Sequence, residues 1–301
     1  MSNRTMISTA AITLNLISLI GTIFIVLICI FMLSMLLPSI IRKQDVVLIL
    51  VANNYLALLA FALVAIPTNI DMVRGDYNLY IGMETFGCRI RAYIIYTSLA
   101  IIFHTFVLQA VFRFFRVVYP SYVWLQHART YTLIIPILWL ISFLFMIPIH
   151  FWHDIQFIRM ENTCFIAIHC ARGFLWSNMI MYGIPVIVIN ILYIQLVRFM
   201  RRPSMIASTR AKRDVIVTRR IELVACVLTL MVIPSVVLKF MLPFTDVGKP
   251  LFYRIQNIVL VTAMVMLSLM LVYVTPQVKE VLIRNRKPTK TIPIPCNINV
   301  F

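Results

Sequence analysis

The chain has 301 residues, of which 62% are hydrophobic and only 12% are charged. Soluble domains average roughly 45–50% apolar and about 25% charged residues, so this composition excludes a soluble globular protein and predicts an integral membrane protein. The seven glycines and the absence of alternating ten-residue segments argue against an outer-membrane barrel. The spanning segments are therefore expected to be helices. The net charge of +17 does not indicate nucleic-acid binding, because the cations follow the membrane topology described below.

Seven apolar stretches follow one another along the chain, and each is long enough for the roughly 20 residues of a spanning helix. The first lacks a basic N-terminal region and a small-residue cleavage site, so it is interpreted as a helix of the protein and not as a signal peptide. We expect an all-α bundle of seven transmembrane helices at 10–275, with a tail at 1–9 before it and a segment at 276–301 after it. The stretches are 10–37, 46–70, 90–112, 131–151, 174–199, 221–242 and 255–275.

The distribution of basic residues predicts the orientation of these helices. With the N-terminus outside, the inner segments and adjoining helix ends hold 18 cations and 4 anions, whereas the outer parts hold 9 cations and 6 anions. Excess positive charge marks the cytoplasmic side, so we expect a multi-pass plasma-membrane protein with its N-terminus outside and its basic runs near membrane lipids. Asn3 then begins an outward-facing Asn-Arg-Thr glycosylation acceptor. The inner segments are 38–45, 113–130, 200–220 and 276–301.

A short helix is expected after the seventh span. Thr275 and Pro276 have the types typical of an N-cap and a first helical residue. Val278, Val281 and Leu282 then fall on one helical face among basic residues. This pattern predicts an amphipathic helix on the inner membrane surface, and the alternative is a continuation of the seventh helix.

The third stretch connects a cysteine to an arginine cluster. Cys88 and Arg113 are 25 residues apart, roughly 38 Å along a helix, which approaches the about 40–45 Å of a bilayer with its polar margins. Disulfide chemistry belongs to the oxidising outside. Cys88 is therefore expected at the outer face, where Cys164 and Cys170 in the second outer loop are its candidate partners.

Further motifs keep a joint spacing along the chain. They are Cys88 before the third span, Phe112-Arg113-Phe114 at its end, Tyr119-Pro120, Trp139, Pro148, Pro185 with Tyr193, and Pro234. In type and spacing this set resembles the rhodopsin-like (class A) G-protein-coupled receptors, a family with seven transmembrane helices and an Asp-Arg-Tyr triplet at the end of the third. The resemblance extends over the whole chain.

The chain also departs from this family at several positions. Phe112 stands where the family has the acid of the triplet, and Asn54 stands where it has an aspartate in the second helix. In the sixth helix Met231 to Pro234 retains only the proline of Cys-Trp-x-Pro. In the seventh, the Asn-Pro-x-x-Tyr motif is represented only by Tyr273. The chain thus resembles a divergent member.

The resemblance implies roles for individual residues. It implies a Cys88–Cys164 disulfide, preferred over Cys170 because the distance from Cys164 to Pro185 is closer to that of the family. It implies that Asn54 joins a central polar network. Arg113, Asp214, Tyr193, Pro234 and Tyr273 would form the switch for G-protein coupling, with Arg113 pairing with Asp214 at rest. Other polar residues within spans, Asn53, His104, Gln109 and Asn190, are expected to bond across helices.

The ligand pocket is expected to open outward between helices 3, 5, 6 and 7. Ile95 occupies the position where amine receptors of the family carry an aspartate, so the ligand is expected to be a peptide or another small molecule and not a monoamine. The alternative for each lining residue is ordinary packing. The candidate lining residues are Ile95, Tyr96, Leu99, Lys239, Tyr253 and Asn257, with Glu84 and Arg254 at the rim.

Together these features predict a receptor that senses an extracellular ligand and activates a heterotrimeric G protein. Neither a cofactor nor a metal site is expected. An enzyme is not expected either, because the sequence has no phosphate-binding loop, Gly-x-Ser-x-Gly or His-Glu-x-x-His motif. Two alternatives are a receptor-like protein without coupling and a small transporter or channel. Transport is disfavoured by the scarcity of charges within spans and the absence of an inverted repeat.

Overall fold

The computed structural model describes residues 2–77, 79, 82–167, 170–200, 233, 237, 252–274 and 278. Within this part, six helical segments are long and apolar enough to cross a membrane. The span expected at 221–242 lies outside the described residues except for Ile233 and Val237, and the expected surface helix after Pro276 does so except for Val278. The six segments are α1 (Ser2–Lys43), α2 (Val46–Asp76), α3 (Phe86–Val118), α4 (Ala128–Phe151), α5 (Ala171–Asn178) with the π-helical turn η2 (Met179–Gly183) and α6 (Ile184–Met200), and α8 (Phe252–Val274).

Most of the helices extend beyond the apolar stretches that predict them, and capping side chains set the starts of α2 and α3. The carboxylate of Asp45 accepts a hydrogen bond from the Val47 backbone N–H at 3.0 Å before α2. The Thr85 hydroxyl accepts one from the Cys88 backbone N–H at 3.1 Å before α3. Each cap satisfies a donor that the first helical turn leaves unpaired. α1 begins at Ser2, so residues 2–9, expected as a tail, belong to the helix.

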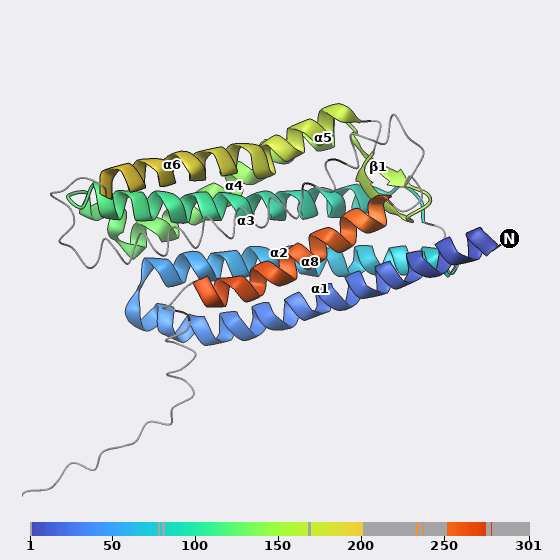
Figure 1. The fold of residues 1–301 in the computed structure, drawn as a ribbon, viewed down its shortest axis with the longest axis horizontal. Helices are drawn as coiled ribbons and strands as arrows, with labels where there is room; N and C mark the ends of the chain where they lie inside the picture. Colours follow the sequence, from blue (N-terminus) through green and yellow to red (C-terminus); the bar gives the residue numbers. More distant parts are fainter. Residues whose placement is uncertain are drawn as a thin grey trace, which may run out of the picture.

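The long α3 lies at the centre of the described helices. It packs against α2, α4 and α6, whereas α1 packs against α2 and α8 (Figure 1). Large apolar side chains remain exposed on the outward faces, for example Ile20 and Leu27 on α1 and Leu133 and Leu140 on α4. In a membrane these faces meet lipid, which is as apolar as the side chains.

One short antiparallel hairpin caps an end of the helices. β1 (Ile155–Ile158) pairs with β2 (Thr163–Ile166), so that Phe157 lies opposite Cys164. The hairpin lies at the same end as the N-terminus (Figure 1), and this end is called the hairpin end below. The 3-10 helix η1 (Val123–Gln126), which connects α3 to α4, lies at the opposite end.

Candidate functional site

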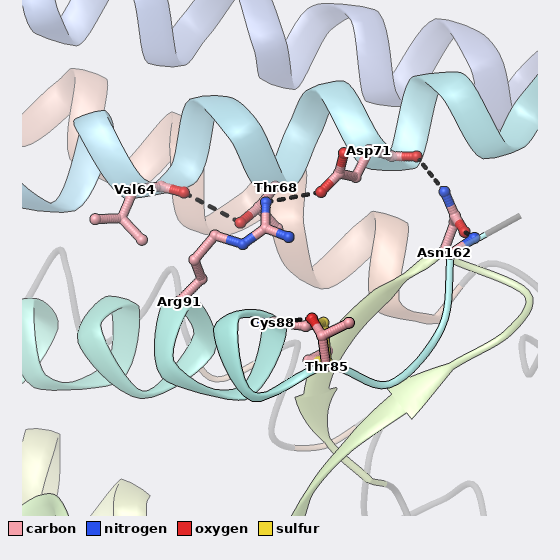
Figure 2. Close-up of a disulfide and its surroundings, with 9 residues drawn as sticks. Val64, Thr68, Asp71, Thr85, Cys88, Arg91 and Asn162 are labelled. Carbon is pink, nitrogen blue, oxygen red and sulfur yellow. Dashed lines mark hydrogen bonds and ion pairs between the residues drawn. A yellow bond between two sulfur atoms is a disulfide. The ribbon is translucent and has the colours of Figure 1, made fainter. Parts of the chain in front are cut away.

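The expected disulfide between Cys88 and Cys164 is present. The two sulfur atoms are 1.97 Å apart, and the Cα atoms are 5.7 Å apart. Cys88 lies in the first turn of α3 and Cys164 in β2, so the bond attaches the hairpin to the helix (Figure 2). Cys170, the other candidate, lies outside this bond, and its sulfur accepts a hydrogen bond from Gln156 Nε2 at 3.8 Å. The hairpin is therefore covalently held above the helices.

Strand β2 brings two of the expected pocket residues together. The backbone N–H of Ile166 donates to the Tyr96 hydroxyl at 3.4 Å, and the Tyr253 hydroxyl donates to the Ile166 carbonyl at 3.5 Å. The rings of Phe165 and Tyr253 are stacked, with centroids 5.6 Å apart and planes 8° apart. The end of this strand thus connects α3 to α8.

The other expected pocket residues have different environments. Ile95 and Leu99 are buried in the main hydrophobic core. Asn257 on α8 donates to Asn69 Oδ1 on α2 at 2.7 Å. Glu84 is exposed in the segment before α3, and Lys239 lies outside the described residues. Among the expected lining residues in the described part, the two tyrosines are therefore the ones that bond to strand β2.

The turn of the hairpin holds a buried charge cluster that the sequence did not predict. Arg254, expected at an exposed rim, is only 7% exposed. Its Nη2 lies 2.7 Å from Asp76 Oδ1 at the end of α2, and its Nε lies 2.8 Å from Glu161 Oε2 in the turn. Asp76 Oδ2 also accepts from Asn15 Nδ2 of α1 at 2.7 Å. The Arg254 guanidinium thus joins α8 to α2 and to the hairpin, and Asp76 extends the cluster to α1.

Burial dominates the acidity of Glu161. Removal of its carboxyl from water raises its pKa from 4.5 to about 7, and the negative charge of Asp76 contributes in the same direction. The positive charge and hydrogen bond of Arg254 lower the pKa but do not offset burial. The folded state therefore binds a proton at Glu161 more tightly than an exposed glutamate does.

A second, uncharged contact holds the same turn. Asn162, in left-handed backbone conformation with φ 53°, donates to the Asp71 carbonyl of α2 at 2.8 Å (Figure 2). Its side-chain oxygen accepts from the Gly82 N–H at 2.5 Å. A Cβ at Gly75 would lie 2.6 Å from the Asn162 Cβ, so glycine there permits the close approach. The Asp71 carboxylate pairs instead with Arg91 at 2.7 Å.

A cavity of about 350 Å³ lies between α3, α4 and α6. Its walls are apolar side chains together with His104, whose Nδ1 lies 2.7 Å from Ser142 Oγ. Ile137 and Ile184 in its walls are exposed on the outer surface of the helices. None of the expected pocket residues lines this cavity.

Polar residues at the centre join neighbouring helices. Asn53 of α2 donates to Thr105 Oγ1 of α3 at 2.8 Å and accepts from Trp139 Nε1 of α4 at 2.9 Å. The expectation of a cross-helix bond is wrong for Asn190, whose amide donates at 2.9 Å to the Val186 carbonyl of its own helix, because an Asn side chain reaches the carbonyl four residues before it. Asn54 is fully buried, and its amide atoms have no hydrogen-bond partner in the described part of the chain.

The arginine at the opposite end is buried in α3 and is 5% exposed. Phe112, which replaces the acid before Arg113, packs edge-on against Tyr131 of α4 with ring centroids 5.3 Å apart. The guanidinium of Arg116 lies 5.8 Å from the Phe112 ring centroid. Phe112 thus makes an aromatic contact with α4 at the position where the triplet has its acid.

The remaining switch residues are distributed along the described helices or lie outside them. Tyr193 is half-buried on α6, and Tyr273 near the end of α8 is 78% exposed. Asp214 and Pro234 lie outside the described residues. The predicted roles of these residues therefore stay predictions.

A bundle of long apolar helices, with a disulfide-tethered hairpin at one end and a buried arginine at the other, is the architecture of a multi-pass membrane protein. The family model for seven-transmembrane receptors of the rhodopsin family matches residues 42–279. The chain therefore belongs to the rhodopsin family of seven-transmembrane receptors. Comparison with curated proteins finds no match.

Proposed function

We propose that this protein is a G-protein-coupled receptor in the plasma membrane that senses an extracellular peptide or small molecule. Family membership supports a signalling receptor, and the disulfide between α3 and the hairpin is the observation that carries the proposal. The proposal includes a seventh span at 221–242, an outside N-terminus and a cytoplasmic surface helix after Pro276. The hairpin end then faces outward, and Arg113 faces the G protein.

The ligand is proposed to bind beneath or against the hairpin. Tyr96 and Tyr253 both bond to Ile166 at the end of β2, so a ligand that contacts this strand can alter the relation between α3 and α8. Ile95 offers no carboxylate to an ammonium group, which disfavours a monoamine.

A G-protein activation panel in a heterologous cell tests this proposal. Cells expressing the receptor are exposed to a peptide and metabolite library, and nucleotide exchange is measured on each G-protein class. We expect the receptor to activate at least one G-protein class, either in response to a ligand or without one. We expect Arg113→Ala to abolish this activation while the amount of receptor at the cell surface stays unchanged. Activation that persists in Arg113→Ala would contradict the assigned role of Arg113.

A second candidate function is a receptor-like protein that binds its ligand without activating a G protein. It is favoured by Phe112, because the aromatic contact with Tyr131 replaces the acid next to Arg113. Phe112→Asp discriminates between the two functions. A variant that gains coupling while the wild type shows none supports the second candidate, whereas coupling by the wild type supports the first.

A further inference from the structure

The hairpin end contains more negative than positive charge in its buried cluster. Asp76 and Glu161 share Arg254, and the side chains of the three residues are 7%, 2% and 9% exposed. When both carboxyls are ionised, the cluster has one negative charge in excess. Buried like charges disfavour ionisation of both groups, so one carboxyl in such a cluster takes up a proton readily.

The hydrogen bonds identify which carboxyl binds the proton. Both oxygens of Asp76 accept from side chains, one from Arg254 at 2.7 Å and one from Asn15 at 2.7 Å. Among the described side chains, Glu161 accepts only from Arg254. Hydrogen bonds to a carboxylate stabilise its charged form. Fewer hydrogen bonds therefore stabilise the charged form of Glu161, and Glu161 is the group that protonates.

The other groups near the cluster do not offset its excess charge. On the hairpin, Arg159 is the first residue of the turn and is exposed, and on α2 Arg74 is exposed. The carboxylate of Asp71 is neutralised by Arg91. From α1 the contribution is the neutral amide of Asn15, whose oxygen is buried without a partner in the described part of the chain. Arg254 Nη1 is buried without a partner there as well.

We propose that Glu161 is a proton-binding site that couples pH on the hairpin side of the membrane to the docking of the hairpin turn, residues 159–162, against α2 and α8. The proton is the ligand, the carboxyl of Glu161 is its acceptor, and Arg254 and Asp76 set its affinity. Asn162 holds the same turn through uncharged hydrogen bonds. These bonds stabilise docking to the same extent at every pH.

The docking of the turn depends on pH because the docked and undocked states bind a proton at Glu161 with different affinities. In the docked turn the pKa of Glu161 is about 7, against 4.5 for an exposed glutamate. Because the docked state binds the proton more tightly, acid stabilises docking, and docking weakens as pH rises from 4.5 through 7. Between pH 5 and pH 8 the docking equilibrium is expected to change by roughly fifty- to a hundredfold.

Amide hydrogen exchange of the hairpin in the full chain, reconstituted in lipid nanodiscs, tests the proposal between pH 5 and pH 8. Each wild-type rate is divided by that of Glu161→Gln at the same pH, which cancels the intrinsic pH dependence of exchange. Glu161→Gln mimics the protonated group and is expected to stay docked throughout. As pH rises, amide exchange in the wild-type turn is expected to become several tens of fold faster relative to exchange in Glu161→Gln. Parallel profiles for the two proteins would overturn the proposal.

Asp71→Asn is the matched control, because it removes a carboxylate at the same end of α2 that lies outside the cluster. Its exchange profile is expected to follow that of the wild type. If it instead abolished the pH dependence, the proton site would not be Glu161.

A direct titration keeps the proposal testable even where Glu161→Gln folds poorly. The ¹³C carboxyl signal of Glu161 is expected to titrate with a midpoint well above that of an exposed glutamate. Asp76→Asn removes the neighbouring negative charge, so it is expected to move that midpoint to lower pH. A midpoint at the ordinary value in the wild type would refute the proposal. These readouts need no G protein, so their failure is distinct from failure of the proposed function.

Discussion

At the scale of single residues, polar side chains in the spans are distinguished by whether they bond across helices or within one. Asn53 joins α2 to both α3 and α4 through two hydrogen bonds. Within the described part of the chain, Asn190 bonds the carbonyl of Val186 in its own helix. Sequence reasoning expected both to bond across helices, since each is an amide in an apolar stretch. Their partners depend on which face the helix turns to its neighbours, and the sequence alone does not specify this.

This difference predicts different costs for the same substitution. Asn53→Ala removes two cross-helix hydrogen bonds and is expected to lower the free energy of unfolding by about 1–2 kcal/mol, since such bonds average about 0.6 kcal/mol with a maximum near 1.7. Asn190→Ala, the matched control, is expected to have a much smaller effect. Thermal unfolding of both variants in the same detergent measures the difference. Equal losses would show that Asn53 does not act across helices.

At the scale of elements, the hairpin is held by a covalent bond and by its turn. The disulfide links β2 to α3, and the turn lies against α2 and α8 through Asn162 and Glu161. The resemblance to the receptor family implied the disulfide. It did not imply the turn contacts, because they depend on where a four-residue turn lies relative to helices far away in sequence.

Loss of the disulfide is expected to reduce the amount of receptor at the cell surface. The bond closes a long loop between residues 76 positions apart, and removal of such a bond costs about 2–4 kcal/mol. Cys88→Ala and Cys164→Ala are expected to lose surface expression to the same degree, as is the double variant. Cys170→Ala, which lies outside the bond, is expected to retain it. Surface labelling by flow cytometry measures all four, and a defect confined to Cys170→Ala would contradict the assignment.

The fit between α2 and the turn gives a separate prediction. Gly75→Ala places a methyl group 2.6 Å from the Asn162 Cβ, so the turn must shift. Overpacking of this kind costs about 1–3 kcal/mol. Hydrogen exchange in residues 159–162 is expected to become faster at every pH. Gly87→Ala is the control, since its methyl group meets only Thr85 Oγ1 at 4.0 Å. Similar exchange in both variants would show that Gly75 is not a contact site.

At the scale of the whole molecule, charge determines the expected orientation. Inner segments hold 18 cations against 4 anions, and the outer parts 9 against 6. This asymmetry predicts an N-terminus outside the cell and a C-terminus inside. The N-terminus and the hairpin lie at the same end (Figure 1), so this orientation also places the proposed proton site and ligand site outside.

Epitope tags at the two termini measure the orientation. An N-terminal tag is expected to bind antibody on intact cells, and a C-terminal tag only after permeabilisation. Asn3→Gln is expected to remove a glycosidase-sensitive mass, because Asn3 begins the Asn-Arg-Thr acceptor. Antibody binding to the C-terminal tag on intact cells would reverse the orientation and place the hairpin inside.

The sequence by itself determined the class of protein and the six described spans, and its motif spacing produced the resemblance that implied the family and the Cys88–Cys164 bond. These features follow from apolar length and from residue spacing, which are properties of the chain read in one dimension. Only the tertiary structure decided that Arg254 is buried and that Asp76 and Glu161 share it. Residues 76, 161 and 254 are far apart in the chain, and their ionisation depends on burial that arises when the helices and hairpin pack together.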